Sequence, residues 1–277
     1  MSDIRDLLSK DAIELGIDER TWQDSIRRAG TILENRKIAG PSYTQAMIDS
    51  VDRHGPYIVI APGFAFAHAR PDNSVTATGM SLVRLQEPVK FGHPNNDPVT
   101  LVMALAATNA DQHQAALAQL AKVLSNTDKR TALEKALTAD EILAVFDAHI
   151  RSETSEARDG KATASSESQA LASGSTAAET RTGKNLVLTV CGNGLGTSLF
   201  LKNTLEQVLD YWGWSPYLTV EATDTISARG KSSDADFILT SGEIAKTLGE
   251  VDVPVRVIND FTSQAEIDAA LRELYDV

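Results

Sequence analysis

The first half of the chain changes between two hydrophobic patterns. Five apolar residues recur at helical spacing and predict a first helix: Trp22, Ile26, Ala29, Ile32 and Leu33. A second helix is predicted from Pro41, which suits a first helical turn, to His54 and Gly55. Strand-like runs follow over residues 57–61, 64–67, 79–85 and 99–107. A helix over about 111–124 and a last one opened by the capping box Thr138-Ala-Asp-Glu141 complete the pattern, which predicts a mixed sheet flanked by helices.

The second half alternates strands with helices. Residues 186–190 are continuously apolar, which is typical of a strand covered on both faces. Further strands are predicted over residues 217–220, 237–239 and 253–258, and helices over 197–212, 244–248 and 265–274. This order predicts a small parallel α/β sheet of about four strands.

A stretch of low hydrophobicity separates the two halves. Of the 33 residues from 152 to 184, 22 are Ala, Ser, Thr or Gly, and Leu171 is the only large apolar one. Such a stretch cannot bury enough surface to offset the entropy lost on ordering. The sequence therefore predicts a domain over 1–151, a flexible linker over 152–183 and a domain over 184–277.

Charge and composition exclude several classes of protein. The chain of 277 residues has a net charge of −12, divided as −3, −2 and −7 over the three parts, which disfavours a duplex nucleic-acid surface. The longest apolar run, residues 99–107, is too short to span a bilayer, and the charged N-terminus does not resemble a signal peptide. One cysteine excludes a disulfide scaffold, and no cluster has metal-ligand spacing. A cytoplasmic protein without a metal is expected.

The cysteine lies where an anion would bind. Cys191 ends the first strand of the second half, and a glycine-rich loop leads from it into a helix: Gly192, Asn193, Gly194, Leu195, Gly196, Thr197 and Ser198. Inward-facing amides and the helix N-terminus favour a phosphate there. The same field predicts a lowered thiol pKa and a thiolate near neutral pH. A buried structural cysteine is the plain alternative.

Three enzymatic interpretations compete for this loop. A dinucleotide site would use Gly192, Gly194 and a following glycine, with Glu221 as the ribose acid, but the domain is too short for that fold. A Walker A loop lacks its lysine. A cysteine phosphatase needs an arginine where Thr197 stands, so the loop is expected to hold a phosphoryl group rather than hydrolyse it quickly.

The loop resembles a known family. Its form over residues 191–198, C-G-N-G-L-G-T-S, is similar to the phosphocysteine loop of enzyme IIB domains of the bacterial phosphoenolpyruvate-dependent sugar phosphotransferase system, nearest the ascorbate branch. The resemblance implies that Cys191 carries the phosphoryl group on a small four-stranded parallel α/β domain.

A histidine in the first half is a second candidate nucleophile. His68 ends a strand-like run, and a neutral imidazole accepts phosphoryl groups at neutral pH. Arg70 follows and could bind the incoming phosphate. On these residues alone, a structural or surface histidine is an equal alternative. His93 and His149 are predicted to be surface residues, and His54 to close its helix.

The surrounding sequence also resembles a family. Residues 54–71, together with Thr21-Trp-Gln-Asp24 and residues 91–98, are similar to enzyme IIA domains of the mannitol/fructose superfamily, again nearest the ascorbate branch. Ala67 departs from the proline of many relatives. The resemblance implies that His68 is phosphorylated and that His113 lies beside the phosphoryl group.

Together the two resemblances imply a relay. The histidine phosphocarrier protein would phosphorylate His68, His68 would phosphorylate Cys191, and Cys191 would phosphorylate a sugar, expected to be L-ascorbate, presented by a membrane enzyme IIC. No cofactor is implied, and the protein is expected in the cytoplasm, associated peripherally with the membrane through IIC. A homodimer stays open. The alternatives are a regulatory phosphoacceptor without catalysis and a component for another sugar or polyol.

Overall fold

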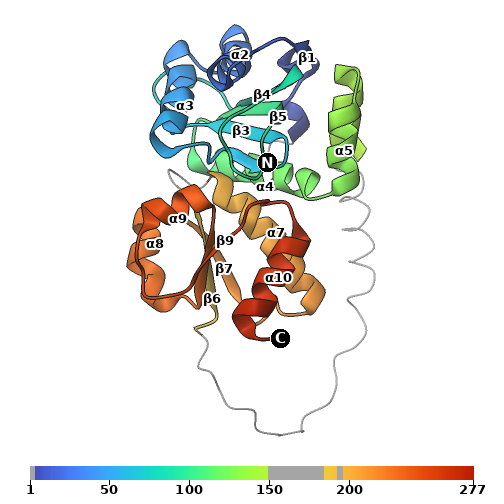
Figure 1. Cartoon of the computed structure of the whole chain (residues 1–277). Coiled ribbons are helices and arrows are strands. Elements are labelled where there is room, and N and C mark those ends of the chain that lie inside the picture. The colour runs from blue at the N-terminus through green and yellow to red at the C-terminus, as the bar shows by residue number, and fades with distance from the viewer. Residues whose placement is uncertain (1–3, 149–183, 192–195) are drawn as a thin grey trace, which may run out of the picture.

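The computed structural model describes residues 4–148, 184–191 and 196–277. These residues form two sheets with their own helices, one in the N-terminal domain (residues 4–148) and one in the C-terminal domain (the described residues from 184 on) (Figure 1). The expected linker, 152–183, lies outside the described residues.

The N-terminal sheet has five strands in the order β1-β4-β5-β3-β2. Its strands are β1 (Ile13–Ile17), β2 (Val59–Ala61), β3 (Phe64–His68), β4 (Gly79–Val89) and β5 (Val99–Ala106). The pairs β1–β4 and β3–β5 are parallel, whereas β2–β3 and β4–β5 are antiparallel. The predicted mixed sheet is confirmed, with β1 as an additional strand.

The N-terminal helices begin where local chemistry favours it. They are α1 (Ile4–Leu7), α2 (Trp22–Asn35), α3 (Pro41–His54), α4 (Ala110–Leu124) and α5 (Thr127–Lys135), with a short 3₁₀ turn η1 (Lys10–Ala12) and a further helix over 139–148. The Thr21 hydroxyl accepts the amide of Asp24 at the start of α2. The predicted helix start at Thr138 is confirmed, since the Glu141 amide donates to the Thr138 hydroxyl at 3.2 Å, while the Glu141 carboxylate accepts the amide of Leu137 rather than that of Thr138.

The C-terminal sheet has four parallel strands in the order β7-β6-β8-β9, as predicted. Its elements are β6 (Leu186–Cys191), α7 (Gly196–Trp212), β7 (Thr219–Asp224), α8 (Thr225–Lys231), η2 (Ser232–Asp234), β8 (Phe237–Thr240), α9 (Gly242–Leu248), β9 (Val255–Val257) and α10 (Gln264–Tyr275). Figure 1 shows α8 and α9 on one face and α7 and α10 on the other. The central β6 is therefore covered twice, which explains its apolar sequence.

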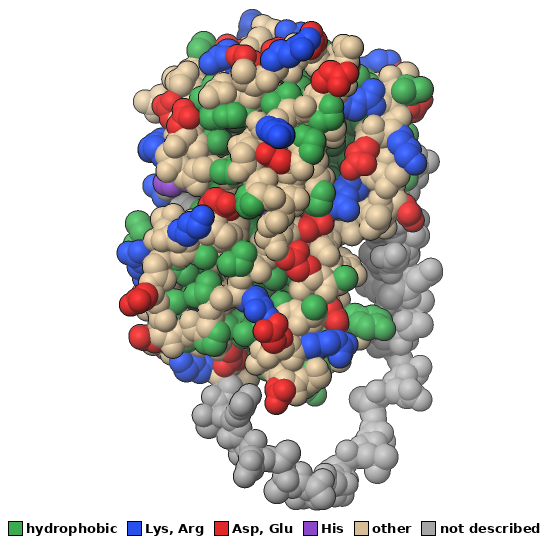
Figure 2. Space-filling view, in the orientation of Figure 1, with side chains coloured by type: hydrophobic (Ala, Val, Ile, Leu, Met, Phe, Trp, Pro, Cys, Tyr) green, Lys and Arg blue, Asp and Glu red, His purple; other side chains and the backbone are tan. Residues whose placement is uncertain are grey.

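The two domains pack directly against each other. Helices α4 and α7 lie side by side at the junction (Figure 1). The Phe66 ring of β3 contacts the Phe200 ring of α7 with 5.6 Å between centroids. Figure 2 shows charges of both signs interspersed over this face of both domains, with no patch of one sign.

Candidate active site at the domain junction

A hairpin and a buried tyrosine position His68. Gly63 has φ +74°, which the turn between β2 and β3 requires and which other residues rarely adopt. β3 is buried along its length and ends at His68, opposite Leu105 of β5. The Tyr43 hydroxyl donates to the Leu105 carbonyl at 2.7 Å and accepts the Ala69 amide at 3.1 Å. Tyr43 therefore ties together the ends of both strands, a role the sequence did not predict.

The contacts of His68 prepare one ring nitrogen for attack. Its Nδ1 lies 3.0 Å from the Phe66 carbonyl oxygen. A carbonyl only accepts hydrogen bonds, so Nδ1 carries the proton and Nε2 holds the lone pair. Burial lowers the pKa of His68, against a smaller opposing effect of the Phe66 bond. The ring is thus neutral at neutral pH, with Nε2 as its nucleophilic atom.

Tyr57 contacts one candidate nucleophile and lies near the other. Its ring meets His68 edge-on, with 5.9 Å between centroids, and its hydroxyl shares a 2.8 Å hydrogen bond with Ser50. Burial raises the pKa of Tyr57 to about 12, the Ser50 bond opposes this, and the nearby Cys191 sulfur adds to the rise. Tyr57 is the second site residue that sequence reasoning missed, although it lies within the histidine segment, residues 54–71.

Cys191 ends the central strand of the other domain. Its side chain is buried, and its Sγ lies 3.2 Å from the Ser198 hydroxyl and 3.9 Å from the Thr223 carbonyl oxygen. Thr197 and Ser198, in the first turn of α7, are also buried. Gly196 opens that helix, whereas Gly192, Asn193, Gly194 and Leu195 lie outside the described residues. The phosphate cradle stays a prediction.

The expected thiolate is wrong for this arrangement of the domains. Burial raises the pKa of Cys191, and the hydrogen bonds from Ser198 and Thr197 offset only part of that effect. The Asp224 carboxylate, across the strand pair, raises the pKa further. Desolvation thus outweighs the stabilisation that Ser198 and Thr197 give the thiolate, and the thiol is protonated at neutral pH.

The fold brings both nucleophiles to one buried junction. The Phe66 ring lies 5.5 Å from the His68 ring and 5.6 Å from the Phe200 ring, centroid to centroid, and Phe200 follows Ser198 by two residues in α7. The ring of Tyr57 contacts the ring of His68, and Cys191 is close enough to Tyr57 to raise its pKa. His68 is 3% exposed and Cys191 is 2% exposed. A group on either residue is therefore shielded from water while the domains are packed in this way.

The other predicted residues have different outcomes. Arg70 is exposed just beyond β3, and His113 lies in the first turn of α4 with its side chain outside the described part, so both roles stay predictions. His54 ends α3 as predicted, and His149 lies outside the described residues.

The prediction that His93 is a surface residue is wrong. His93 is 6% exposed, and its Nδ1 accepts the amides of Asn95 and Asn96 at 3.3 and 3.0 Å. It therefore organises the turn before β5. A turn-rich sequence does not reveal a side chain that folds back onto its own backbone.

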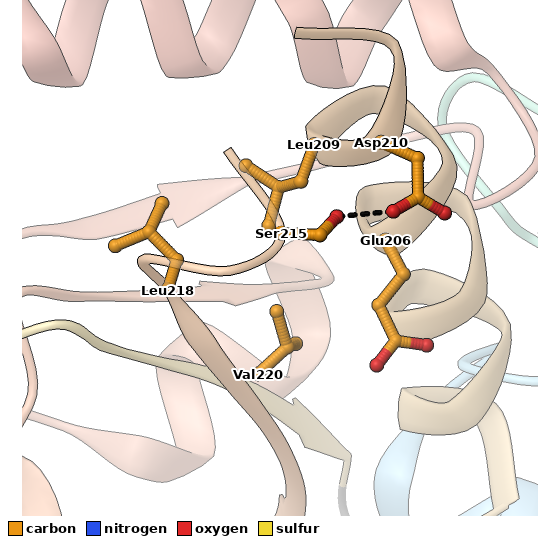
Figure 3. A pocket seen from close by; sticks show the side chains of 6 residues that line it. All are labelled: Glu206, Leu209, Asp210, Ser215, Leu218 and Val220. Carbon is orange, nitrogen blue, oxygen red and sulfur yellow. Dashed lines mark hydrogen bonds between the residues drawn. The ribbon is translucent and has the colours of Figure 1, made fainter. Parts of the chain in front are cut away.

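A cavity elsewhere in the C-terminal domain is a poor place for a phosphate. A cavity of about 290 Å³ lies at the start of β7, the end of the strand remote from Asp224 and Cys191 (Figure 3). Glu206 and Asp210 line it, and two carboxylates repel an anion. Within the described residues, no group of three or more His, Cys, Asp or Glu could hold a metal ion, and no helix is long and apolar enough to cross a membrane.

Each of the two domains matches a known protein family. Residues 6–149 match the family model described as phosphoenolpyruvate-dependent sugar phosphotransferase system, EIIA 2. Residues 186–273 match the model described as PTS system, lactose/cellobiose specific IIB subunit. An EIIA domain followed by a IIB domain of these kinds defines a component of a phosphotransferase. The chain belongs to the EIIA 2 family of the sugar phosphotransferase system and carries a IIB domain after it.

Individual relatives cover the first half of the chain. The ascorbate-specific PTS system EIIA components of Shigella boydii serotype 4 and Escherichia coli K12 are each 36% identical over 146 residues, 52% of this chain and 95% of theirs. The solution structure of the mannitol-specific cryptic phosphotransferase enzyme IIA CmtB from Escherichia coli has 30% identity and a TM-score of 0.49, covering 52% of this chain and 98% of that one.

Proposed function

We propose that His68 receives a phosphoryl group from the histidine phosphocarrier protein, passes it to Cys191, and that Cys191 passes it to a sugar presented by a membrane enzyme IIC. The family assignment supports a phosphoryl relay in sugar uptake. One observation supports the choice of residues: the neutral His68 and the single cysteine, Cys191, both lie near the buried side chain of Tyr57.

The described contacts suit each chemical step. In the first, the Nε2 lone pair of His68 attacks phosphorus and the bond to the carrier's nitrogen breaks. The proton held on Nδ1 by the Phe66 carbonyl lets His68 leave later as a neutral imidazole.

In the second step, the Cys191 sulfur attacks phosphorus and the P–N bond breaks, with its electron pair remaining on Nε2. Nε2 then takes up the thiol proton, which makes the imidazole an imidazolium because Nδ1 is already protonated. Burial lowers the pKa of His68 and so disfavours this charged form, and loss of the proton to water restores the neutral ring. Alignment of the two residues in a water-poor junction supplies most of the acceleration.

Labelling from phosphoenolpyruvate tests both residues. With the general phosphotransferase proteins and labelled phosphoenolpyruvate, His68→Ala abolishes labelling of the whole chain, while Cys191→Ser accumulates phosphohistidine, because a serine hydroxyl is far less ionised than a thiol. His54→Gln, a matched control on α3, labels normally. Full labelling of His68→Ala, or undiminished sugar phosphorylation by Cys191→Ser, assigns the relay to other residues.

We propose L-ascorbate as the sugar, since the relatives of the N-terminal domain are named ascorbate-specific. A lactose- or cellobiose-type disaccharide is the second candidate, because the description of the matching IIB family names those sugars. Membranes that contain the cognate IIC, supplied with each labelled sugar in turn, distinguish them: phosphorylation of cellobiose but not of ascorbate overturns the first choice.

A further inference from the structure

A short segment of the C-terminal domain covers the open edge of the N-terminal sheet. Residues 259–262, between β9 and α10, face β2, which is the edge strand of its sheet. The Phe261 amide donates to the Ile60 carbonyl at 2.9 Å, a main-chain bond of the kind that another strand would make there. We refer to residues 259–262 as the docking segment.

Asn96 connects both sides of this contact. Its side-chain amide donates to the Val59 carbonyl of β2 at 3.0 Å and to the Asn259 carbonyl of the docking segment at 2.8 Å. Asn96 is 2% exposed, so both bonds form away from water, where an unmade bond is costly.

Arg130 of α5 holds the other end of the docking segment. Its guanidinium donates to the Thr262 hydroxyl at 2.7 Å and lies 3.4 Å from the Asp260 carboxylate. The side chains of Arg130 and Asp260 are 21% and 17% exposed, so solvent screens this pair less than a surface ion pair.

The docking segment is shaped from within its own domain. Glu266, in the first turn of α10, accepts the amides of Asn259 and Asp260 at 2.8 and 2.9 Å. Asp260 in turn accepts the Thr262 amide at 2.9 Å. These bonds within the C-terminal domain hold the docking segment in its conformation before it contacts the N-terminal domain. Less conformational entropy is therefore lost when the domains dock.

The docked state has two opposite consequences for the relay. It places Tyr57, the ring neighbour of His68, near Cys191, yet the two candidate nucleophiles are only 3% and 2% exposed, so a protein carrier cannot reach the histidine and a membrane partner cannot reach the cysteine. The domains must separate before phosphate is received or delivered, and dock between these events.

We propose that the docking segment, through Arg130 and Asn96, is a latch that positions His68 and Cys191 for transfer and excludes outside partners while it is closed. Arg130, Asn96 and Asp260 are positioning residues. The inference rests on the proposed function for the transfer step, but the closure of the latch does not depend on phosphate.

Thiol reactivity measures closure without any phosphotransfer. Cys191 is the single cysteine of the chain, so alkylation of the full-length protein by iodoacetamide reports on that residue alone. Loss of a partly buried ion pair weakens domain docking by about 1 kcal/mol, which raises the open fraction about fivefold. Arg130→Met therefore raises the alkylation rate of Cys191 about fivefold. Asp260→Asn, which keeps an oxygen for the Thr262 amide, raises it as well, and the double variant adds little. Lys135→Met, an exposed charge on the same helix, leaves the rate unchanged.

Rapid quenching with labelled phosphocarrier then separates the two relay steps in the full-length chain. Arg130→Met accelerates phosphorylation of His68 and slows transfer to Cys191, whereas a variant with a damaged fold slows both. Equal alkylation rates in wild type, Arg130→Met and Asp260→Asn overturn the latch, and so does an unchanged transfer rate to Cys191. Faster alkylation in a chain that takes no label from the carrier supports the latch and refutes the relay instead.

Discussion

Burial acts on the two nucleophiles in opposite directions. It lowers the pKa of His68, which keeps the imidazole neutral and ready to accept phosphate. It raises the pKa of Cys191, which keeps the thiol protonated at neutral pH while it is buried. The protein thus stores no free thiolate in the docked state, and the sulfur is protected from unwanted reactions.

These shifts predict a stability maximum near neutral pH. The pKa of His68 is lower in the folded chain than its ordinary value of 6.5. The unfolded chain therefore binds the proton first, and the free energy of unfolding decreases as the pH falls below 6.5, by at most about 1.4 kcal/mol per pH unit. The pKa of Cys191 is higher in the folded chain than its ordinary value of 9.0. Its contribution to the free energy of unfolding is therefore present below pH 9.0 and is lost as the pH rises above that value. Urea unfolding from pH 5 to 10 measures both limbs. His68→Gln should flatten the acid limb alone and Cys191→Ser the alkaline limb alone; unchanged limbs contradict the assignment.

One hydroxyl group is buried at a cost. Tyr275 packs edge-on against Trp214 and Phe237, and among the described residues its hydroxyl is the buried side-chain oxygen or nitrogen without a hydrogen-bond partner. Tyr275→Phe removes that unsatisfied group and should raise the free energy of unfolding by about 1 kcal/mol. Tyr43→Phe is the matched control, because it removes a bonded hydroxyl and should lower the free energy by a similar amount. Urea titrations in which both variants lose stability would show that the Tyr275 hydroxyl is solvated.

At the scale of the elements, the end of one strand serves two purposes. Asp224 ends β7 and caps α8, accepting the amides of Ile226 and Ser227 at 2.9 Å each. It also lies opposite Cys191 in the parallel register, where its charge raises the thiol pKa. Helix capping and thiol chemistry therefore share one carboxylate.

Two substitutions separate these roles. Asp224→Asn keeps the cap and removes the charge, so the pKa of Cys191 falls while the unfolding free energy changes little. Asp224→Ala removes both, and it lowers the unfolding free energy by about 1 kcal/mol in addition. The pH dependence of Cys191 alkylation and thermal unfolding give the two readouts. Equal thiol titrations in wild type and Asp224→Asn contradict the electrostatic role.

The hydrophobic pattern predicted the long elements better than the short or polar ones. Strand β6 and helix α2 have strong patterns because each is covered by packed neighbours. The pattern missed β1, whose five residues include Gly16, and α5, which is largely polar with Leu133 as its buried residue. These elements are stabilised by tertiary contacts rather than by an amphipathic sequence of their own.

At the scale of the whole molecule, the tether is expected to supply proximity. For the linker predicted from the sequence, 32 residues from 152 to 183, flexible-chain statistics would give an end-to-end distance of about 30 Å and an effective concentration near the millimolar range. Separately expressed residues 1–151 and 184–277 should exchange phosphate, but more slowly at micromolar concentrations than the intact chain. A rate that rises with concentration until it reaches that of the intact chain supports this role. No exchange at any concentration would assign the tether a further one.

The sequence allowed us to predict the two candidate nucleophiles, but not the domain contact near which both lie. A glycine-rich loop after a strand and a histidine beside an arginine are local patterns, readable at residues 191–198 and 68–70. The domain junction rests on single contacts such as Asn96 with Asn259 and Arg130 with Thr262, which have no period along the chain. The pKa of Cys191 was predicted in the wrong direction because the local loop pattern does not reveal how deeply the fold buries the thiol.

The bond between the Phe261 amide and the Ile60 carbonyl offers a direct measure of this motion. In deuterated water that amide exchanges its hydrogen whenever the domains part, while each domain stays folded. The Phe66 amide, bonded to the Ile58 carbonyl within the N-terminal domain, exchanges only when the sheet itself opens. The inverse of the Phe261 protection factor, read by NMR, therefore gives the fraction of time that the chain is open to its partners, and a larger Phe66 protection factor shows that the N-terminal sheet stays folded during that opening. Phosphorylation, sugar and carrier can each be added while the same two hydrogens are followed.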